Sequence, residues 1–130
     1  MAPSPSRNTF LLVAALSGLL AVALGAFGAH ALEDRLSAAA RSVYETAVHY
    51  HFVHTLALLA VGTLSRGTAH GLLRGAGLAF ILGLLLFSGS LYALSMTGIR
   101  WLGAITPLGG LSFMLGWGLL FAWAWRGERP

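Results

Sequence analysis

The sequence predicts an all-α membrane protein with four transmembrane helices in an up-down-up-down bundle. Of its 130 residues, 57% are hydrophobic and only 9% are charged, whereas soluble domains carry about 25% charged residues to face water. The charged side chains divide the chain into four long uncharged runs. Glycine occurs 17 times, nearly twice its usual share of about 7%, as is common in helices that pack closely within lipid. A water-soluble monomer and a disordered chain are therefore both excluded.

Each uncharged run is long enough to cross a bilayer as a helix. The runs hold 22, 20, 25 and 25 residues and cover 8–29, 46–65, 75–99 and 101–125. About 20 residues suffice for a helix, whereas spanning strands have about 10 residues with strict alternation, which none of the runs shows. We therefore predict a single membrane domain over residues 1–130, with helices at 9–31, 43–64, 75–95 and 101–125.

The first predicted helix carries a ridge of small residues that we expect to pack against a neighbouring helix. Small residues recur at every fourth position, at Ser17, Ala21, Gly25 and Ala29. A cleaved signal peptide is an alternative interpretation of this segment. Its apolar stretch exceeds the 7–15 residues of a signal peptide core and no soluble domain follows it, so we expect it to be retained.

The second predicted helix holds most of the ionisable residues within the spans. We expect the alanine-rich segment 32–42 before it to extend the first or the second helix. At 100° per residue, Glu45 and His49 share one helix face, and His51 and His54 share another that is roughly opposite. This arrangement does not form a single stripe of three histidines.

Short connections at 65–74 and 95–100 place the third and fourth predicted helices antiparallel to their neighbours. Gly109 and Gly116 give the fourth helix small packing positions, and Pro107 near its start predicts a kink or a non-helical entry. The small-residue ridges either seal the monomer or form a contact with a second copy, and the sequence leaves both open.

Charge placement predicts both orientation and partners. All eight basic residues are arginines at the ends of the apolar runs, so we expect the lipid bilayer and no nucleic acid as partner. Another membrane protein, or a second copy, is a further candidate. Five of the eight arginines lie on the side of the termini, which predicts that both termini are cytoplasmic.

Two groups of polar residues are candidate sites. The first is a polar cluster at the outer membrane interface, which we interpret as a hydrogen-bonded cluster rather than a metal or haem site. It comprises His30, Glu45, His49 and Arg100. The chain has no cysteine, so thiolate ligands and thiol nucleophiles are absent, and we expect neither a metal nor a cofactor.

The second group is a polar layer near the middle of the membrane. His54 lies ten residues from Leu64, about 15 Å into the span. Serines at similar depth are Ser17, Ser88, Ser90 and Ser112. We predict a neutral His54 that is hydrogen-bonded to a hydroxyl on the third or fourth helix. Its role as structural contact or as part of a pocket, proton path or ligand site stays open.

Four ordered motifs carry a resemblance to a known family. They read GAFGAH at 25–30, YxxxHTLA at 50–57, LFSGSLY at 86–92 and TPxGGxxFxxGW at 106–117. In this order and spacing they resemble the small bacterial inner-membrane family catalogued as domain of unknown function 423, whose eukaryotic relatives are transmembrane-protein-256-like. The resemblance covers roughly residues 10–124. It implies a four-helix protein of the inner membrane, and no activity or catalytic residues.

The sequence supports three hypotheses of function. The first is a non-enzymatic membrane protein that binds or stabilises a partner, because no nucleophile–base pair or phosphate loop is present. The second is a conduit for a small molecule, an ion or protons, lined by His54, Ser88, Ser90 and Thr106. The third is a haem- or quinone-binding redox subunit that uses the histidines.

Overall fold

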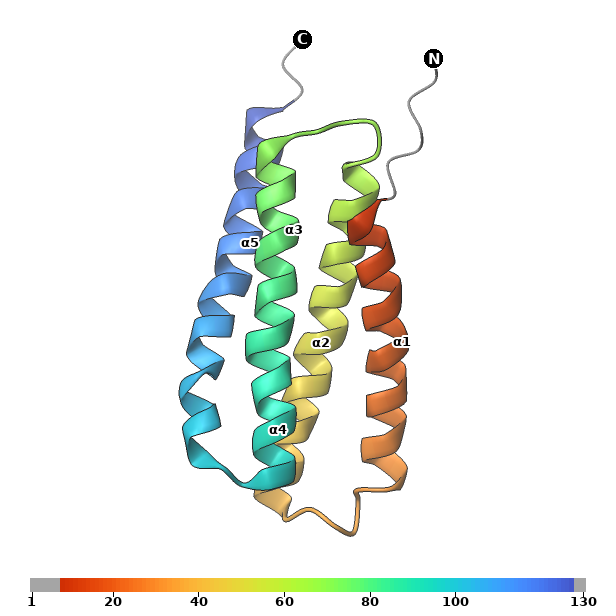
Figure 1. The fold of residues 1–130 in the computed structure, drawn as a ribbon, viewed down its shortest axis with the longest axis vertical. Helices are drawn as coiled ribbons and strands as arrows, with labels where there is room; N and C mark the ends of the chain where they lie inside the picture. Colours follow the sequence, from red (N-terminus) through yellow and green to blue (C-terminus); the bar gives the residue numbers. More distant parts are fainter. Residues whose placement is uncertain (1–7, 128–130) are drawn as a thin grey trace.

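The computed structural model describes residues 8–127 as four antiparallel helical spans (Figure 1). The first two spans are α1 (Thr9–His30) and α2 (Ala38–Leu64). The third consists of α3 (Gly71–Gly83), the π-helical η1 (Leu84–Gly89) and α4 (Ser90–Thr97). The fourth consists of the 3₁₀ turn η2 (Arg100–Ala104) and α5 (Thr106–Arg126). All four spans are long and apolar enough to cross a membrane, so the predicted fold class is confirmed.

The spans pack mainly on their neighbours in the sequence. Helix α1 packs on α2, α2 packs on the third span, and α3 packs on α5 (Figure 1). Residues 8 and 127 lie at the same end of the bundle as the turn at 65–70, which we call the terminal end. The connections at 31–37 and 98–99 lie at the opposite end, which we call the loop end.

Local caps explain where two of the spans begin. The side chain of Asn8 accepts from the amide of Leu11 and donates to the carbonyl of Gly62 over 2.5 Å, which fixes the start of α1 on α2. The hydroxyl of Ser37 accepts from the amide of Ala40. Because this cap precedes an alanine-rich stretch, α2 begins at Ala38, whereas the sequence placed its start at residue 43. The first turns of α2 are thus the extension expected for segment 32–42.

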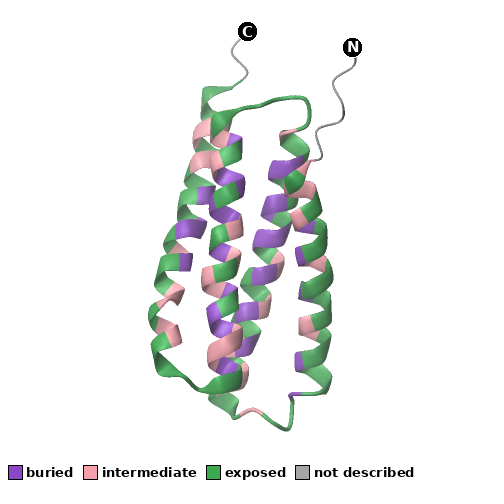
Figure 2. Ribbon diagram, in the orientation of Figure 1, coloured by how far each residue is buried: buried purple, intermediate pink, exposed green. Residues whose placement is uncertain are grey.

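An apolar core fills the bundle between its middle and the terminal end. Its buried members come from α1, α2, α3 and α5 and are Ala14, Ala57, Leu58, Val61, Ala76, Phe80 and Phe113. Figure 2 shows buried residues on the faces that the helices turn toward one another, with exposed residues on the outside. Most of the large exposed side chains are apolar, as suits a lipid-facing surface.

The small residues of α1 that face α2 differ in one position from those predicted. Ser17 and Ala21 are buried and Gly25 is half-buried, but Ala29 is exposed. A spacing of four residues turns the helix by 400°, so twelve residues from Ser17 move Ala29 by about 120° around it. The residue that faces α2 there is Gly28, where an added Cβ would meet the ring of Tyr44. The assignment of Ala29 to the ridge is therefore wrong.

The glycines of α5 allow a close approach to the third span. At Gly109 an added Cβ would meet the backbone of Phe87, and at Gly116 it would lie 2.7 Å from the ring of Phe80. Both glycines are buried packing positions. Pro107 stands in the first turn of α5, directly after η2, so the fourth span has the non-helical entry that its proline suggested rather than a kink within α5.

Candidate functional site

A buried hydrogen-bond network, centred on His51, joins three of the four spans. One ring nitrogen, Nδ1, lies 2.9 Å from the hydroxyl of Tyr92 on α4, and Nε2 lies 3.0 Å from the hydroxyl of Ser17 on α1. Ser17 in turn lies 2.6 Å from the hydroxyl of Thr55. A neutral imidazole offers one donor and one acceptor, so hydroxyls at both nitrogens satisfy it completely. We call these four residues the His51 network.

His51 was absent from the sites expected from the sequence. The available signal was its spacing: it lies three residues before His54 on the face opposite Glu45 and His49, which is the face that α2 buries. Ser17, assigned to packing and mid-membrane polarity, is part of the His51 network as well as of the α1–α2 contact.

His54 is buried at the junction of α2, α3 and α5. The indole Nε1 of Trp117 donates to Nε2 of His54 over 3.1 Å. Because Nε2 accepts, Nδ1 carries the proton and donates to the carbonyl of Tyr50 over 2.9 Å. The imidazole also stacks on the ring of Phe113, with 3.5 Å between the ring centroids. The expected hydroxyl partner is therefore wrong, because the nearest donor on the fourth span is an indole.

The serines of the expected polar layer bind elsewhere and do not form one layer. Ser88 donates to the carbonyl of Ala47 on α2, and Ser112 donates to the carbonyl of Ala79 on α3. Ser90 donates to the carbonyl of Phe87 and lies 2.7 Å from the hydroxyl of Thr106. None of these three hydroxyls contacts His54. They act as separate links within and between spans, since a hydroxyl in lipid needs an internal partner.

The interior polar groups are satisfied within the chain. Among residues 8–127, no buried side-chain nitrogen or oxygen lacks a hydrogen-bond partner. The His51 network runs across the bundle from α4 to α1, rather than along it. Toward the terminal end, the interior consists of the apolar core described above. The described part of the chain therefore holds no polar path that connects its two ends.

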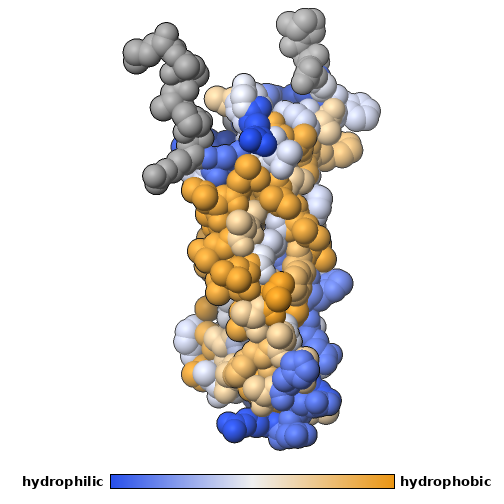
Figure 3. All heavy atoms as spheres, turned by 90° about the vertical axis from the view of Figure 1, so that its right-hand side faces the viewer, coloured by the Kyte–Doolittle hydropathy of each residue, from blue (hydrophilic) through white to orange (hydrophobic). Residues whose placement is uncertain are grey.

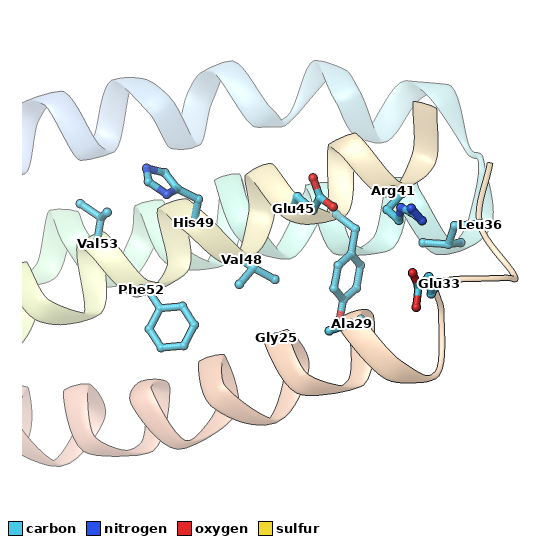
Figure 4. A pocket seen from close by; sticks show the side chains of 12 residues that line it. Gly25, Ala29, Glu33, Leu36, Arg41, Glu45, Val48, His49, Phe52 and Val53 are labelled. Atoms are coloured by element: carbon cyan, nitrogen blue, oxygen red, sulfur yellow. The ribbon is translucent and has the colours of Figure 1, made fainter. Parts of the chain in front are cut away.

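A groove lies between α1 and α2 at the loop end, outside this interior. Its volume is about 530 Å³, and we call it the α1–α2 groove (Figure 4). Its apolar lining includes Gly25, Gly28 and Ala29 from α1 and Val48, Phe52 and Val53 from α2. Its remaining lining is Glu33, Leu36, Arg41, Tyr44, Glu45 and His49. The hydroxyl of Tyr44 donates to the carbonyl of Leu24 and so links α2 to α1 beside the groove.

Polar side chains follow one another along one side of this groove. Arg41, Glu45 and His49 recur at intervals of four residues along α2, and Glu33 lies opposite Arg41 beyond the end of α1 (Figure 4). Neither Arg41 nor either glutamate forms an ion pair within residues 8–127. The exposed imidazole of His49 contacts the ring of Tyr50 and has no hydrogen-bond partner in that range. Apart from the Tyr44 hydroxyl, the polar side chains of the groove are thus unpaired within residues 8–127, in contrast to those of the interior.

The predicted outer-interface cluster is only partly assembled. Glu45 and His49 share the groove, as their shared helix face predicts. His30 ends α1 and Arg100 begins η2, both exposed at the loop end but outside the groove lining. No hydrogen bond or ion pair joins these four residues, so the hydrogen-bonded cluster we expected is wrong. Across the described residues, no group of three His, Cys, Asp or Glu side chains could hold a metal ion.

Comparison with known proteins identifies relatives along most of the chain. The family model described as "Protein of unknown function (DUF423)" matches residues 24–110. The UPF0382 membrane protein of Staphylococcus saprophyticus is 48% identical over 113 residues, which cover 87% of this chain and 93% of that protein. The UPF0382 membrane protein YwdK of Bacillus subtilis is 47% identical over 111 residues, which cover 85% of this chain and 90% of that protein.

One of the relatives is named as an inner membrane protein. The UPF0382 inner membrane protein YgdD of Escherichia coli is 39% identical over 119 residues, covering 92% of this chain and 91% of that protein. No solved structure matches the chain significantly. With four membrane-spanning helices and these relatives, the chain is a membrane protein that belongs to the DUF423 family.

Proposed function

We propose that this protein is a non-enzymatic membrane protein that binds a partner from within the bilayer, and that the α1–α2 groove is the binding site. The observation that carries the proposal is the contrast between interior and groove. Buried polar groups satisfy one another, whereas Arg41, Glu45 and His49 line an open groove without partners. Exposed charged groups without a partner in the chain are available to pair with a ligand at the membrane interface, and charge-assisted hydrogen bonds are among the stronger ones.

The alternative of a conduit receives less support from the same contacts. The His51 network consists of groups that exchange protons, but it crosses the bundle sideways and ends at Thr55. Beyond Thr55 the interior holds Ala57, Leu58 and Val61, which offer no polar group. A transport path would require that this apolar core open.

The proposal also covers orientation. Within the described residues, Arg66, Arg74 and Arg126 border the terminal end. In the sequence, Arg7 directly precedes Asn8 and Arg129 follows Gly127, and both lie outside the described residues. The loop end carries Arg35, Arg41 and Arg100. By the positive-inside rule the terminal end faces the cytoplasm, and the groove opens in the outer leaflet.

Photocrosslinking in intact cells tests the binding role. A photoreactive phenylalanine analogue replaces Phe52, which lines the groove, or Leu16, which is 58% exposed on α1 and outside it. We expect a discrete adduct from position 52 and only diffuse lipid labelling from position 16. Gly25→Leu, which fills the groove, should remove the discrete adduct. Identical labelling from both positions would refute the proposed function.

A further inference from the structure

We infer that the α1–α2 groove binds a phospholipid whose headgroup carries both a phosphate and a primary ammonium, as phosphatidylethanolamine does. This inference rests on the proposed binding role and names its ligand. Three features of the groove support it: its depth in the membrane, the order of its polar groups, and the signs of their charges.

The groove reaches from the membrane surface into the acyl region. Helix α1 has 22 residues and is about 33 Å long, so it just spans a hydrocarbon core of about 30 Å. Glu33 follows its end and therefore lies at headgroup level. From Glu45 to Val53 the groove descends eight residues along α2, or about 12 Å. Figure 3 shows hydrophilic side chains that extend along one edge of the molecule, from the loop end toward its apolar middle.

The lining of the groove changes with depth in the same order as the headgroup, ester carbonyls and acyl chains of a phospholipid. Arg41 and the two glutamates stand at the level of a headgroup, with a guanidinium suited to a phosphate. His49 lies one turn below Glu45, where the ester carbonyls of a glycerolipid follow its phosphate, and its free imidazole has a donor to offer. Below His49 the lining becomes apolar, with Val48, Phe52 and Val53 beside Gly25.

The charges distinguish among headgroups. One guanidinium and two carboxylates line the groove, and none of them is paired within the chain. A primary ammonium donates hydrogen bonds to Glu33 and Glu45 while its phosphate accepts from Arg41. A choline headgroup has no N–H to donate, so it loses the bonds to the carboxylates. A glycerol headgroup leaves a net anionic lipid facing two carboxylates, which repel it.

The test measures lipid binding to the purified full chain by native mass spectrometry. Three lipids with the same acyl chains are titrated, with ethanolamine, choline or glycerol headgroups. We expect the ethanolamine lipid to bind about tenfold more tightly than the other two, the difference that one charge-assisted hydrogen bond supports. Equal affinity for the three lipids would overturn the inference.

Charge variants with matched controls locate the site. Arg41→Gln and Glu45→Gln should each weaken binding of the ethanolamine lipid about tenfold. Arg35→Gln and Asp34→Asn alter exposed charges of the same loop that do not line the groove, and should leave binding unchanged. Glu45→Lys should shift the preference toward the glycerol lipid. Equal losses in Arg41→Gln and Arg35→Gln would overturn the assignment to the groove.

The two proposals fail in different ways. If position 52 captures a discrete protein adduct while the three lipids bind equally, the binding role stands and the lipid assignment is wrong. If position 52 gives the same diffuse labelling as position 16 and the three lipids also bind equally, the groove has no specific occupant and both proposals fall. Thermal unfolding in detergent verifies that each charge variant remains folded.

Discussion

Trp117 and His54 are joined by a 3.1 Å hydrogen bond in which the indole is the donor, and this bond connects α5 to α2. The pair is asymmetric in its exposure: His54 is only 4% exposed, whereas Trp117 is 43% exposed. An exposed indole on a lipid-facing helix has no water to bind within the hydrocarbon core, so the imidazole is its available acceptor. This bond orients the imidazole and fixes its tautomer.

A double-mutant cycle measures the contribution of this bond. Trp117→Phe removes the donor and His54→Leu removes the acceptor, and the double variant completes the cycle. We expect a coupling free energy of about 0.6 to 2 kcal/mol, the range for hydrogen bonds between transmembrane helices. His54→Gln keeps an acceptor and should be more stable than His54→Leu. Unfolding in detergent provides the free energies, and a coupling near zero would show that the bond does not stabilise the fold.

The contact between α1 and α2 should depend on Gly28 more than on Gly25. An added Cβ at Gly28 would enter the ring of Tyr44, which is held by its hydrogen bond to Leu24. At Gly25 the nearest atom would be Val48 at 3.5 Å, an ordinary contact. Gly28→Ala should therefore lower the unfolding free energy by about 1 to 3 kcal/mol, as overpacking does, and Gly25→Ala should change it little. Equal stability of the two variants would contradict this assignment.

Alanine at Gly109 should be the most damaging of the small substitutions in α5. Its Cβ would meet the backbone of Phe87, which cannot turn aside as a side chain can. Gly118→Ala is the matched control on the same helix, because nothing lies within 4 Å of its Cβ position. We expect reduced yield and a lower melting temperature for Gly109→Ala, and parental behaviour for Gly118→Ala. Similar melting temperatures would mean that the two spans do not approach as closely as described.

The His51 network predicts a difference between two serines. Ser17→Ala leaves Nε2 of His51 and the hydroxyl of Thr55 without their partner, which costs about 1 to 3 kcal/mol for buried groups. Ser42→Ala removes an exposed hydroxyl near the start of α2 and should cost little. Tyr92→Phe should act in the same direction as Ser17→Ala, because it removes the other partner of His51. The measurement is again detergent unfolding, and parity between the serine variants would argue against a buried network.

The orientation predicts the behaviour of reporters. A reporter that is active only in the periplasm should be silent when fused after Arg129, because five of the eight arginines then lie inside. Inserted in the connection at 31–37, the same reporter should be active. Activity at the C-terminus and silence in the connection would reverse the proposed topology and place the groove in the inner leaflet.

The four spans could be predicted from the sequence because their main determinant is the length of uncharged chain between charges. The face shared by Glu45 and His49 was also predictable, since both lie within one uninterrupted helix. The start of α2 could not be predicted in the same way. Its first residues, after the cap at Ser37, lie outside the uncharged run that defined the predicted span. Ala29 was misplaced because a spacing of four drifts around a helix of 3.6 residues per turn.

The partners of His54 could not be derived from depth alone. Ser88, Ser90 and Ser112 lie at suitable heights, but each hydroxyl bonds a carbonyl, which hydropathy and periodicity do not reveal. The charge pattern of the groove was visible only in part. Arg41 and Glu33 come from either side of the connection at 31–37, whose path decides whether both line the groove. Arg100 belongs to the fourth span, which does not border the groove.

The π-helical turn η1 gives the third span a phase offset between its two halves. A π turn holds one residue more than an α turn, so the residues after it are rotated by about 100° relative to an uninterrupted helix. The half before η1 presents Gly83 to Phe113 of α5, and the half after it presents Tyr92 to His51 of α2. Deleting one residue from η1 would bring the halves back into step and turn Tyr92 away from His51. The π turn therefore sets the helix phase at which the third span meets α5 through Gly83 and α2 through Tyr92.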